Sequence, residues 1–126
     1  MQNILLISEG LSISFFKKFD FSSYGVVHVS AQEVQVISGE NYVIFEPGDL
    51  SDYSDQELNM FPFSSPQAVQ VRFNDLILCN RTLICSLNGS QKIFVDNDHG
   101  MVLDNKQFYD QLQANPNWDW RKVESI

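Results

Sequence analysis

Three short apolar runs in the first half of the chain limit its fold most, because runs of this length are typical of strands. They span Val26–Val29, Val34–Ile37 and Tyr42–Phe45. The last two runs are joined by Ser38–Asn41, which contains a glycine, as the loop of a β-hairpin often does. An antiparallel sheet is therefore expected at the centre of the fold.

Other segments are predicted to add strands to this sheet. Asn3–Ile7 holds a continuous apolar run, which is typical of a buried strand, and apolar and polar residues alternate over Val69–Phe73, as in a half-buried strand. Lys92–Val95 and Met101–Leu103 are predicted as two further strands. The residues between them, Asp96–Gly100, are rich in Asp, Asn and Gly and therefore indicate a turn.

Helices are predicted where apolar residues recur at a spacing of three or four. The spacing favours a helix over Leu11–Phe19, with an alternating strand as the rival, and predicts a second helix over Asp75–Leu87. Asn105 is the candidate cap of a last helix that ends before Pro116. A short helix is also expected around Asp55–Met60, inside a polar loop.

These elements predict one domain of the α+β class. The sequence of 126 residues contains no internal repeat and no linker rich in Pro or Gly. We expect residues 1–126 to form a mainly antiparallel sheet with two to three packed helices.

The charge of the chain is strongly negative and unevenly distributed. Sixteen acidic residues against eight basic ones give a net charge of −8 at pH 7, which argues against nucleic-acid binding and against an anionic membrane surface. No Lys or Arg occurs between Lys18 and Arg72. The eight acids of that interval are Asp20, Glu33, Glu40, Glu46, Asp49, Asp52, Asp55 and Glu57. From Arg72 onward, seven acids nearly balance six bases.

Four of these acids lie in Asp49–Glu57, within a loop bracketed by Pro47 and Pro62, and Tyr53 stands among them. One interpretation is a solvated loop that keeps the protein soluble. The other is a docking surface for a basic protein, because complementary charge selects partners and an aromatic residue often anchors an interface. A cation site is disfavoured because the spacing fits no calcium loop and the loop has no His or Cys.

A search for catalytic motifs finds no Gly-rich phosphate loop, nucleophile elbow, paired CxxC or HExxH. Asp96, Asp98 and His99 suggest a small metal-dependent hydrolase as one hypothesis. A calcium-binding loop that began at Asp96 would need Gly at its sixth position and Glu at its twelfth. This chain has Met101 and Gln107 there, which argues against such a loop. A turn built from Asp and Asn side chains is the favoured interpretation. The other histidine lies in an apolar run and is expected to be packed.

The last unusual stretch contains Trp118 and Trp120. It could form an adaptor tail that docks into a partner, but two tryptophans near a terminus more often pack onto the sheet. Cys79 and Cys85 are expected to be reduced thiols, because the chain shows neither a basic amino-terminal segment followed by a signal core nor a membrane span. We therefore expect a cytoplasmic protein.

Several separated segments resemble small bacterial immunity proteins, which are encoded beside polymorphic toxins, including those of contact-dependent growth inhibition systems. They are Ile93–Gly100, Phe108, the Asn-Pro-x-Trp-Asp-Trp sequence at 115–120 and Gly39–Pro47. The resemblance covers about half of the chain. It implies a non-enzymatic inhibitor without cofactors that binds the C-terminal domain of its sibling toxin, often a nuclease.

The family does not fix which residues contact the toxin. Combined with the charge pattern, the resemblance predicts that this chain neutralises a basic toxin domain, most simply an RNase, and that it binds no nucleic acid or membrane. The predicted partner-binding residues are Glu46, Asp49, Asp52, Tyr53, Asp55 and Glu57.

Overall fold

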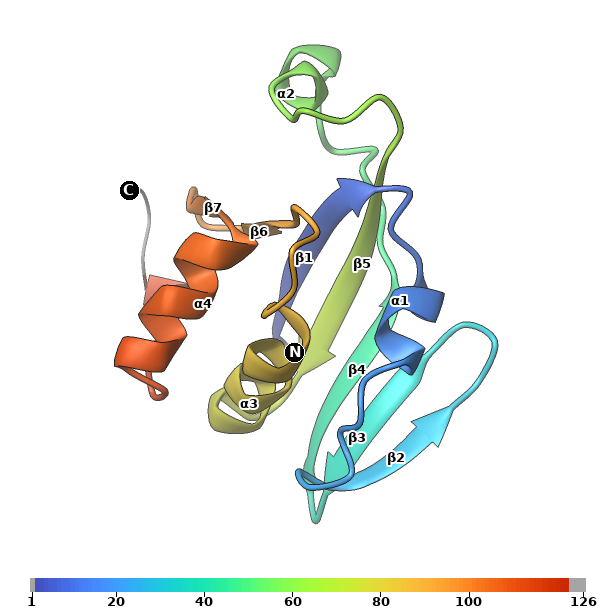
Figure 1. Ribbon diagram of the computed structural model, residues 1–126, viewed down its shortest axis with the longest axis vertical. Coiled ribbons are helices and arrows are strands. Elements are labelled where there is room, and N and C mark those ends of the chain that lie inside the picture. Colours follow the sequence, from blue (N-terminus) through green and yellow to red (C-terminus); the bar gives the residue numbers. More distant parts are fainter. Residues whose placement is uncertain (1, 123–126) are drawn as a thin grey trace.

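The computed structural model describes residues 2–122 and contains a seven-stranded sheet in which all neighbouring strands are antiparallel (Figure 1). From one edge to the other, the strands are β2 (Val26–Val29), β3 (Val34–Ser38), β4 (Asn41–Pro47), β5 (Pro66–Phe73), β1 (Gln2–Glu9), β6 (Phe94–Asp96) and β7 (Val102–Asp104). The expected hairpin is confirmed, since β3 and β4 pair from Val34 with Phe45 to Ser38 with Asn41.

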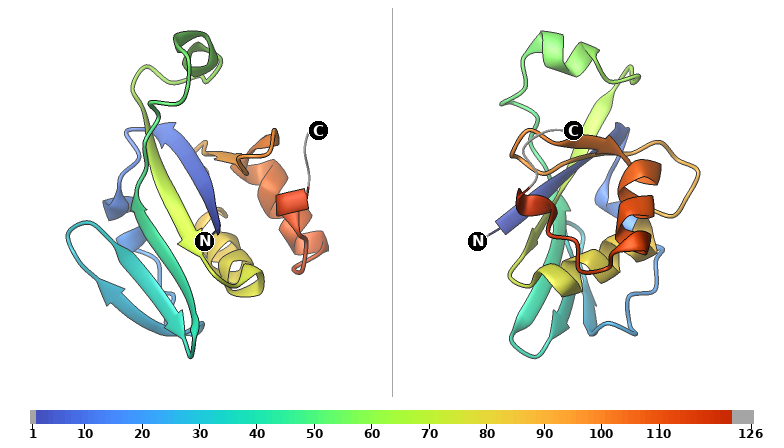
Figure 2. Two further views of the ribbon diagram at one scale, coloured as in Figure 1. Left: turned by 180° about the vertical axis from the view of Figure 1, so that it is seen from behind. Right: turned by 90° about the vertical axis from the view of Figure 1, so that its left-hand side faces the viewer.

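Within residues 2–122, four α-helices accompany the sheet, and three of them pack against it on one face (Figures 1 and 2). The helices are α1 (Ile13–Lys17), α2 (Asp55–Asn59), α3 (Leu76–Ser86) and α4 (Asn105–Ala114), and a 3-10 turn, η1 (Trp120–Lys122), follows them. α1 and α3 contact β4, whereas α4 contacts β6 and β7. α2 has no buried residue and stands away from the sheet, at the top of Figure 1. The α+β prediction is confirmed.

The hydrophobic core fills the space between the sheet and α1, α3 and α4. Side chains alternate between the two faces of each strand, so the core face takes every second residue. The core residues of the three central strands are Ile4 and Leu6 in β1, Val43 and Phe45 in β4, and Val69, Val71 and Phe73 in β5. Phe16 and Phe21 stack on Phe45, with ring centroids 4.7 and 5.4 Å away.

Two details of the sequence interpretation are wrong. The cap of α4 is Asp104 and not Asn105, because the Asp104 carboxylate accepts the Gln107 N–H at 2.8 Å. Asn105 is buried instead, and its side chain accepts the Ile93 N–H at 3.1 Å. His28 is exposed rather than packed, because β2 is an edge strand and pairs only with β3.

Cys79 and Cys85 both lie on α3 and are free thiols, the first buried and the second half-buried. Burial raises the pKa of both thiols, so both are protonated at neutral pH.

None of the helices within residues 2–122 is long and apolar enough to cross a membrane.

Candidate functional site: an acidic groove with an aromatic floor

The sheet face opposite the core, called the open face below, receives the segment that contains α2. Phe94 and Asp96 flank the buried Val95 in β6, so their side chains point to the open face. The hydroxyl of Tyr53 donates a hydrogen bond to Asp96 Oδ2. The ring of Phe61 lies 5.2 Å from that of Phe94, edge to face. These contacts hold the α2 segment (residues 48–65) against one end of the open face.

A groove of about 510 Å³ lies between the α2 segment and the β6–β7 hairpin. Its lining residues combine acidic and apolar side chains and are Tyr53, Glu57, Met60, Phe61, Phe94, Asp96, Asp98, Gly100 and Val102. Met60 is 82% exposed and Val102 45% exposed. They are two of four large hydrophobic side chains that are exposed among residues 2–122, and the other two lie on β2. We call this hollow the acidic–aromatic groove.

The groove is negatively charged at neutral pH. Three carboxylates line it, from Glu57, Asp96 and Asp98, and its lining contains no Lys, Arg or His. Hydrogen bonds from the Ser54 N–H and hydroxyl lower the pKa of Glu57, so this carboxylate is ionised. Burial, followed by the hydrogen bond to Asp96, raises the pKa of Tyr53 well above its ordinary value, so its hydroxyl stays a donor. The potential there favours a cationic ligand.

The structure separates the six predicted partner-binding residues. Tyr53 and Glu57 line the acidic–aromatic groove. Asp52 and Asp55 are exposed on the α2 segment outside that lining. Asp49 accepts the Ser51 N–H at 2.8 Å and lines a different, shallow hollow beside β5.

Glu46, the sixth residue, lies on the open face of β4 and already has a cationic partner. Arg72 donates from Nε to Glu46 Oε2 at 3.0 Å and from Nη2 to Oε1 at 3.2 Å. Gln70 also donates to Glu46 at 2.9 Å. The hydrogen bonds from Arg72 lower the pKa of Glu46. This carboxylate is therefore paired with a cation of the same chain, whereas the hydrogen-bond partners of Asp49 and Glu57 are neutral serine groups.

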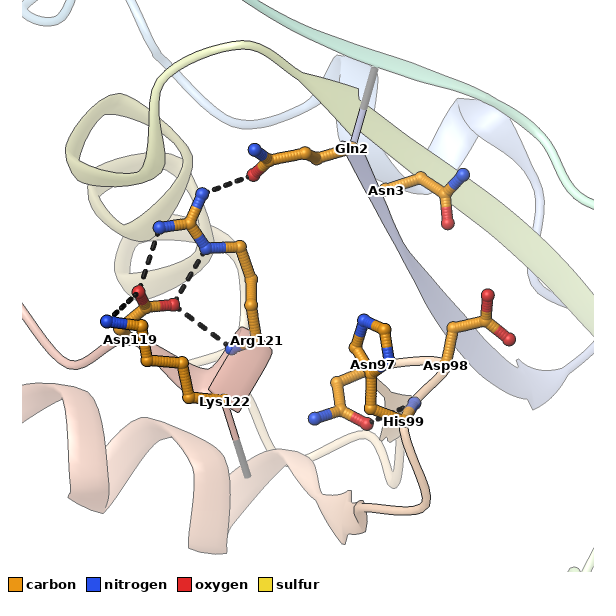
Figure 3. Close-up of a pocket in the computed structure, with 8 residues that line it drawn as sticks. All are labelled: Gln2, Asn3, Asn97, Asp98, His99, Asp119, Arg121 and Lys122. Atoms are coloured by element: carbon orange, nitrogen blue, oxygen red, sulfur yellow. Dashed lines mark hydrogen bonds and ion pairs between the residues drawn. The ribbon is translucent and has the colours of Figure 1, made fainter. Parts of the chain in front are cut away.

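A second hollow, of about 460 Å³, lies on the other side of the β6–β7 turn (Figure 3). In Figure 3, Asp119 and Arg121 form one side of this polar cleft, and Asn97, Asp98 and His99 form the other. Arg121 donates from Nε to Asp119 Oδ1 at 2.7 Å, so the two charges neutralise each other. Asp98 lines both hollows and marks the boundary between them.

The β6–β7 turn has the geometry expected for a turn built from Asp and Asn. Asp98 has a φ of +64° and Gly100 a φ of +93°, both in the left-handed region. Asp96 Oδ1 accepts the Asp98 N–H at 2.8 Å. Asn97 Oδ1 accepts the N–H groups of His99 and Met101. Within residues 2–122, no group of three or more His, Cys, Asp or Glu side chains is arranged to hold a metal ion.

The C-terminal tryptophans pack onto the domain, as the sequence favoured. Trp120 is fully buried, with its ring 5.5 Å from Phe73 and edge to face. Its Nε1–H donates to Asn80 Oδ1 at 2.7 Å. Trp118 is half-buried and packs on Phe108 with a ring separation of 5.2 Å. The Trp120 ring is therefore part of the core.

Sequence reasoning missed the apolar half of the groove, which consists of Met60, Phe61, Phe94 and Val102. A signal was present in the sequence Phe61-Pro62-Phe63, which places two aromatic residues at the end of an otherwise polar loop. Phe63 also packs on Phe94, with a ring separation of 5.8 Å. Aromatic residues in a polar loop indicate that the loop packs onto something.

Comparison with protein-family models, with curated proteins and with solved structures finds no match for this chain. Its function is therefore inferred from the residues and contacts described above.

Proposed function

We propose that this protein is an immunity protein that binds and neutralises the C-terminal domain of a basic toxin, most simply an RNase, in the cytoplasm of a bacterium. The observation that carries the proposal is the acidic–aromatic groove. It combines three carboxylates with exposed Met60 and Val102, and no cation lines it. Protein interfaces commonly combine an apolar centre with a polar rim.

The charge distribution supports a basic partner. The α2 segment also carries Asp49, Asp52 and Asp55 outside the groove lining, and the segment contains no Lys or Arg. A nuclease holds the phosphates of its substrate with Lys and Arg side chains. Carboxylates that pair with those side chains compete directly with the phosphates. The same field speeds association of the two proteins at low ionic strength.

The structure of the α2 segment also suits recognition. α2 has no buried residue, and a capping box formed by Ser54 and Glu57 fixes its first turn. Asp55 and Glu57 are thus presented on a defined helix that has no buried residue, whereas Asp49 and Asp52 precede it. Placing binding groups on exposed segments held by a rigid scaffold is common in proteins.

The experiment pairs this chain with the toxin C-terminal domain encoded immediately upstream of its gene. Growth of a bacterium that expresses the toxin domain is measured with and without this chain, and the affinity of the purified pair is measured by calorimetry. We expect restored growth and a complex whose affinity falls with salt. Absence of a complex with a toxin domain that remains toxic would overturn the proposal.

A charge-matched pair of variants tests where binding occurs. The first variant carries Asp52→Asn, Asp55→Asn and Glu57→Gln. The control carries Asp20→Asn, Glu40→Gln and Asp110→Asn, which are exposed acids outside the α2 segment. Both variants change the net charge by three.

We expect the first variant to weaken binding at least about tenfold, because its acids face the partner, and the control to weaken it less than about threefold. Equal effects of the two variants would mean that only the net charge matters. A folded first variant with full affinity would remove the α2 segment from the mechanism.

A further inference from the structure

We propose that the acidic–aromatic groove holds the side chain of one arginine of the bound protein, with the guanidinium group among Glu57, Asp96 and Asp98 and stacked on Phe61, and with the methylene chain on Phe94. This inference rests on the proposed function and names the group that the groove recognises. It follows from the floor, the charge and the rigidity of the groove.

The floor of the groove is aromatic and continuous. Phe61 lies 5.2 Å from Phe94 and 6.0 Å from Tyr53, measured between ring centroids. Phe63 supports both phenylalanines from 5.8 and 6.3 Å. Exposed Met60 and Val102 extend the apolar surface at the rim. A ligand that fills this hollow must therefore carry an apolar portion.

The charge of the groove requires that the same ligand be a cation. A purely apolar side chain would remove water from three carboxylates without replacing its hydrogen bonds, which is unfavourable. An anion would be repelled. Among natural side chains, only Lys and Arg combine a long methylene chain with a permanent positive charge.

Arginine fits this groove better than lysine does. A guanidinium group is planar, stacks on aromatic rings and donates from five N–H groups, so it can bond two carboxylates at once. A lysine ammonium is more strongly hydrated and has no flat face to stack on a ring. The carboxylates of Asp96 and Asp98 are two residues apart on the same tight turn and offer such a pair of acceptors.

Two of the three acceptors, Asp96 and Glu57, are held by hydrogen bonds before a ligand arrives. Tyr53 donates its hydroxyl to Asp96 Oδ2, and the Asp98 N–H donates to Asp96 Oδ1 at 2.8 Å. Glu57 Oε1 accepts the Ser54 N–H at 2.9 Å. Side chains that are already ordered lose little conformational entropy on binding.

The test uses blocked tripeptides and a methyl probe that the chain already contains. The protein is labelled with ¹³C at its methionine methyl groups and titrated with acetyl-Gly-Arg-Gly-amide, followed by NMR. Met60 lines the groove and is 82% exposed, whereas Met101 is fully buried and serves as the internal control. The comparison peptides carry lysine or citrulline, the neutral isostere of arginine, in place of arginine.

We expect a saturable shift of the Met60 signal with the arginine peptide and an unchanged Met101 signal. The lysine peptide should bind about fivefold more weakly, since its ammonium lacks the stacking contribution. The citrulline peptide should produce no saturable shift, because it has no charge. Equal binding of arginine and lysine, or no saturable shift with arginine, would overturn the inference.

Two variants separate the contribution of the carboxylate charge to arginine binding from the contribution of the aromatic ring. Asp98→Asn should lower the affinity for the arginine peptide about tenfold, because it removes one carboxylate charge. Asn tolerates the positive φ at this position, so the turn is kept. Phe61→Leu should bring the arginine and lysine affinities to within about twofold of each other, because it removes the ring on which the guanidinium group stacks. The Met101 signal at its original position shows that each variant is folded.

The outcomes also separate this inference from the proposed function. If the chain neutralises the toxin domain but the groove does not prefer arginine, the inference is wrong and the function stands. If the groove binds the arginine peptide but no toxin domain, the proposed function is wrong and the groove remains a site for an arginine of another protein.

Discussion

Asn80 joins helix α3 to the C-terminal segment, and replacing it is the sharpest test of how that segment is held. The side chain is 1% exposed. Its Oδ1 accepts the Trp120 Nε1–H at 2.7 Å, and its Nδ2 donates to the carbonyl oxygens of Pro116 and Trp118, both at 3.1 Å. Asn80→Ala removes all three hydrogen bonds and leaves the fully buried indole N–H without an acceptor.

The expected loss follows from these contacts. An unsatisfied buried N–H costs about 1–3 kcal/mol, and two less buried carbonyl groups add roughly 0.5 kcal/mol each. Alanine favours the helix over asparagine and offsets about 0.5 kcal/mol of the loss. The free energy of unfolding should therefore fall by about 1.5–3.5 kcal/mol, a large part of the ~5–15 kcal/mol typical of a domain.

Urea unfolding followed by tryptophan fluorescence measures this loss. Arg81→Ala, an exposed neighbour on α3, is the control and should change stability by less than about 0.5 kcal/mol. Trp120→Phe removes the N–H donor, so Asn80→Ala should cost about 1–2 kcal/mol less in that background. Trp118 remains as the fluorescent probe.

An Asn80→Ala variant as stable as its Arg81→Ala control would refute the reasoning. The same result would indicate that the segment with Trp118 and Trp120 is not held by Asn80, and it would favour the alternative in which this segment docks into a partner. Equal effects of Asn80→Ala with and without Trp120→Phe would mean that the indole N–H does not depend on this amide.

Three other changes have clear expected outcomes. A Cβ at Gly25 would lie 2.5 Å from a backbone carbonyl oxygen of β3, so Gly25→Ala should lower the melting temperature by the equivalent of about 1–3 kcal/mol. Gly89→Ala is the control: a Cβ there would have no atom within 4 Å, so this change should leave the melting temperature unchanged. Tyr53→Phe removes the hydroxyl that donates to Asp96, so it should lower the free energy of unfolding by about 1 kcal/mol. It should also speed proteolysis between residues 49 and 60, and an unchanged cleavage rate would contradict this contact. Hydrogen bonds lower the pKa of several carboxyl groups below their ordinary values, which are 4.5 for Glu46 and 3.8 for Asp104 and Asp119. Their stabilisation is therefore complete above the ordinary pKa and is lost as pH falls through the lowered pKa. Melting scans from pH 7 to pH 3 should show falling stability, and a rise toward pH 3 would contradict this.

The local elements could be predicted from the sequence because their signals are local. The hairpin between β3 and β4 follows from a glycine-containing loop between two apolar runs, and α3 follows from a stripe of apolar residues. The turn at Asp96–Gly100 follows from side chains that bond their own backbone. Each of these signals lies within the segment that it shapes.

The groove could not be predicted in the same way, because its parts meet only in the folded chain. Tyr53 and Asp96 are 43 positions apart, and no local sequence pattern in either segment indicates that the two side chains meet. Phe61 and Phe94 meet because β6 lies beside β1 while the α2 segment packs against one end of the open face. The sequence therefore predicts an acidic loop without the apolar floor next to it.

Asn80 and His28 illustrate the same limit at single positions. Asn80 carries no local pattern, yet it binds a tryptophan 40 positions away. His28 lies in an apolar run, and only the strand order places that run at an edge of the sheet, where the side chain is exposed. Burial of an isolated polar residue depends on topology.

The absence of buried residues in α2 has a consequence for how this surface can change over generations. Most substitutions are harmful because they destabilise the folded state, and substitutions at exposed positions away from specific contacts usually change stability by less than about 0.5 kcal/mol. Positions such as Asp52, Asp55 and Gln56 can therefore take many different residues while the sheet and its core stay intact. Tyr53 and Phe61 meanwhile keep the segment in place. The chain can explore new binding preferences one residue at a time without an accompanying loss of folding.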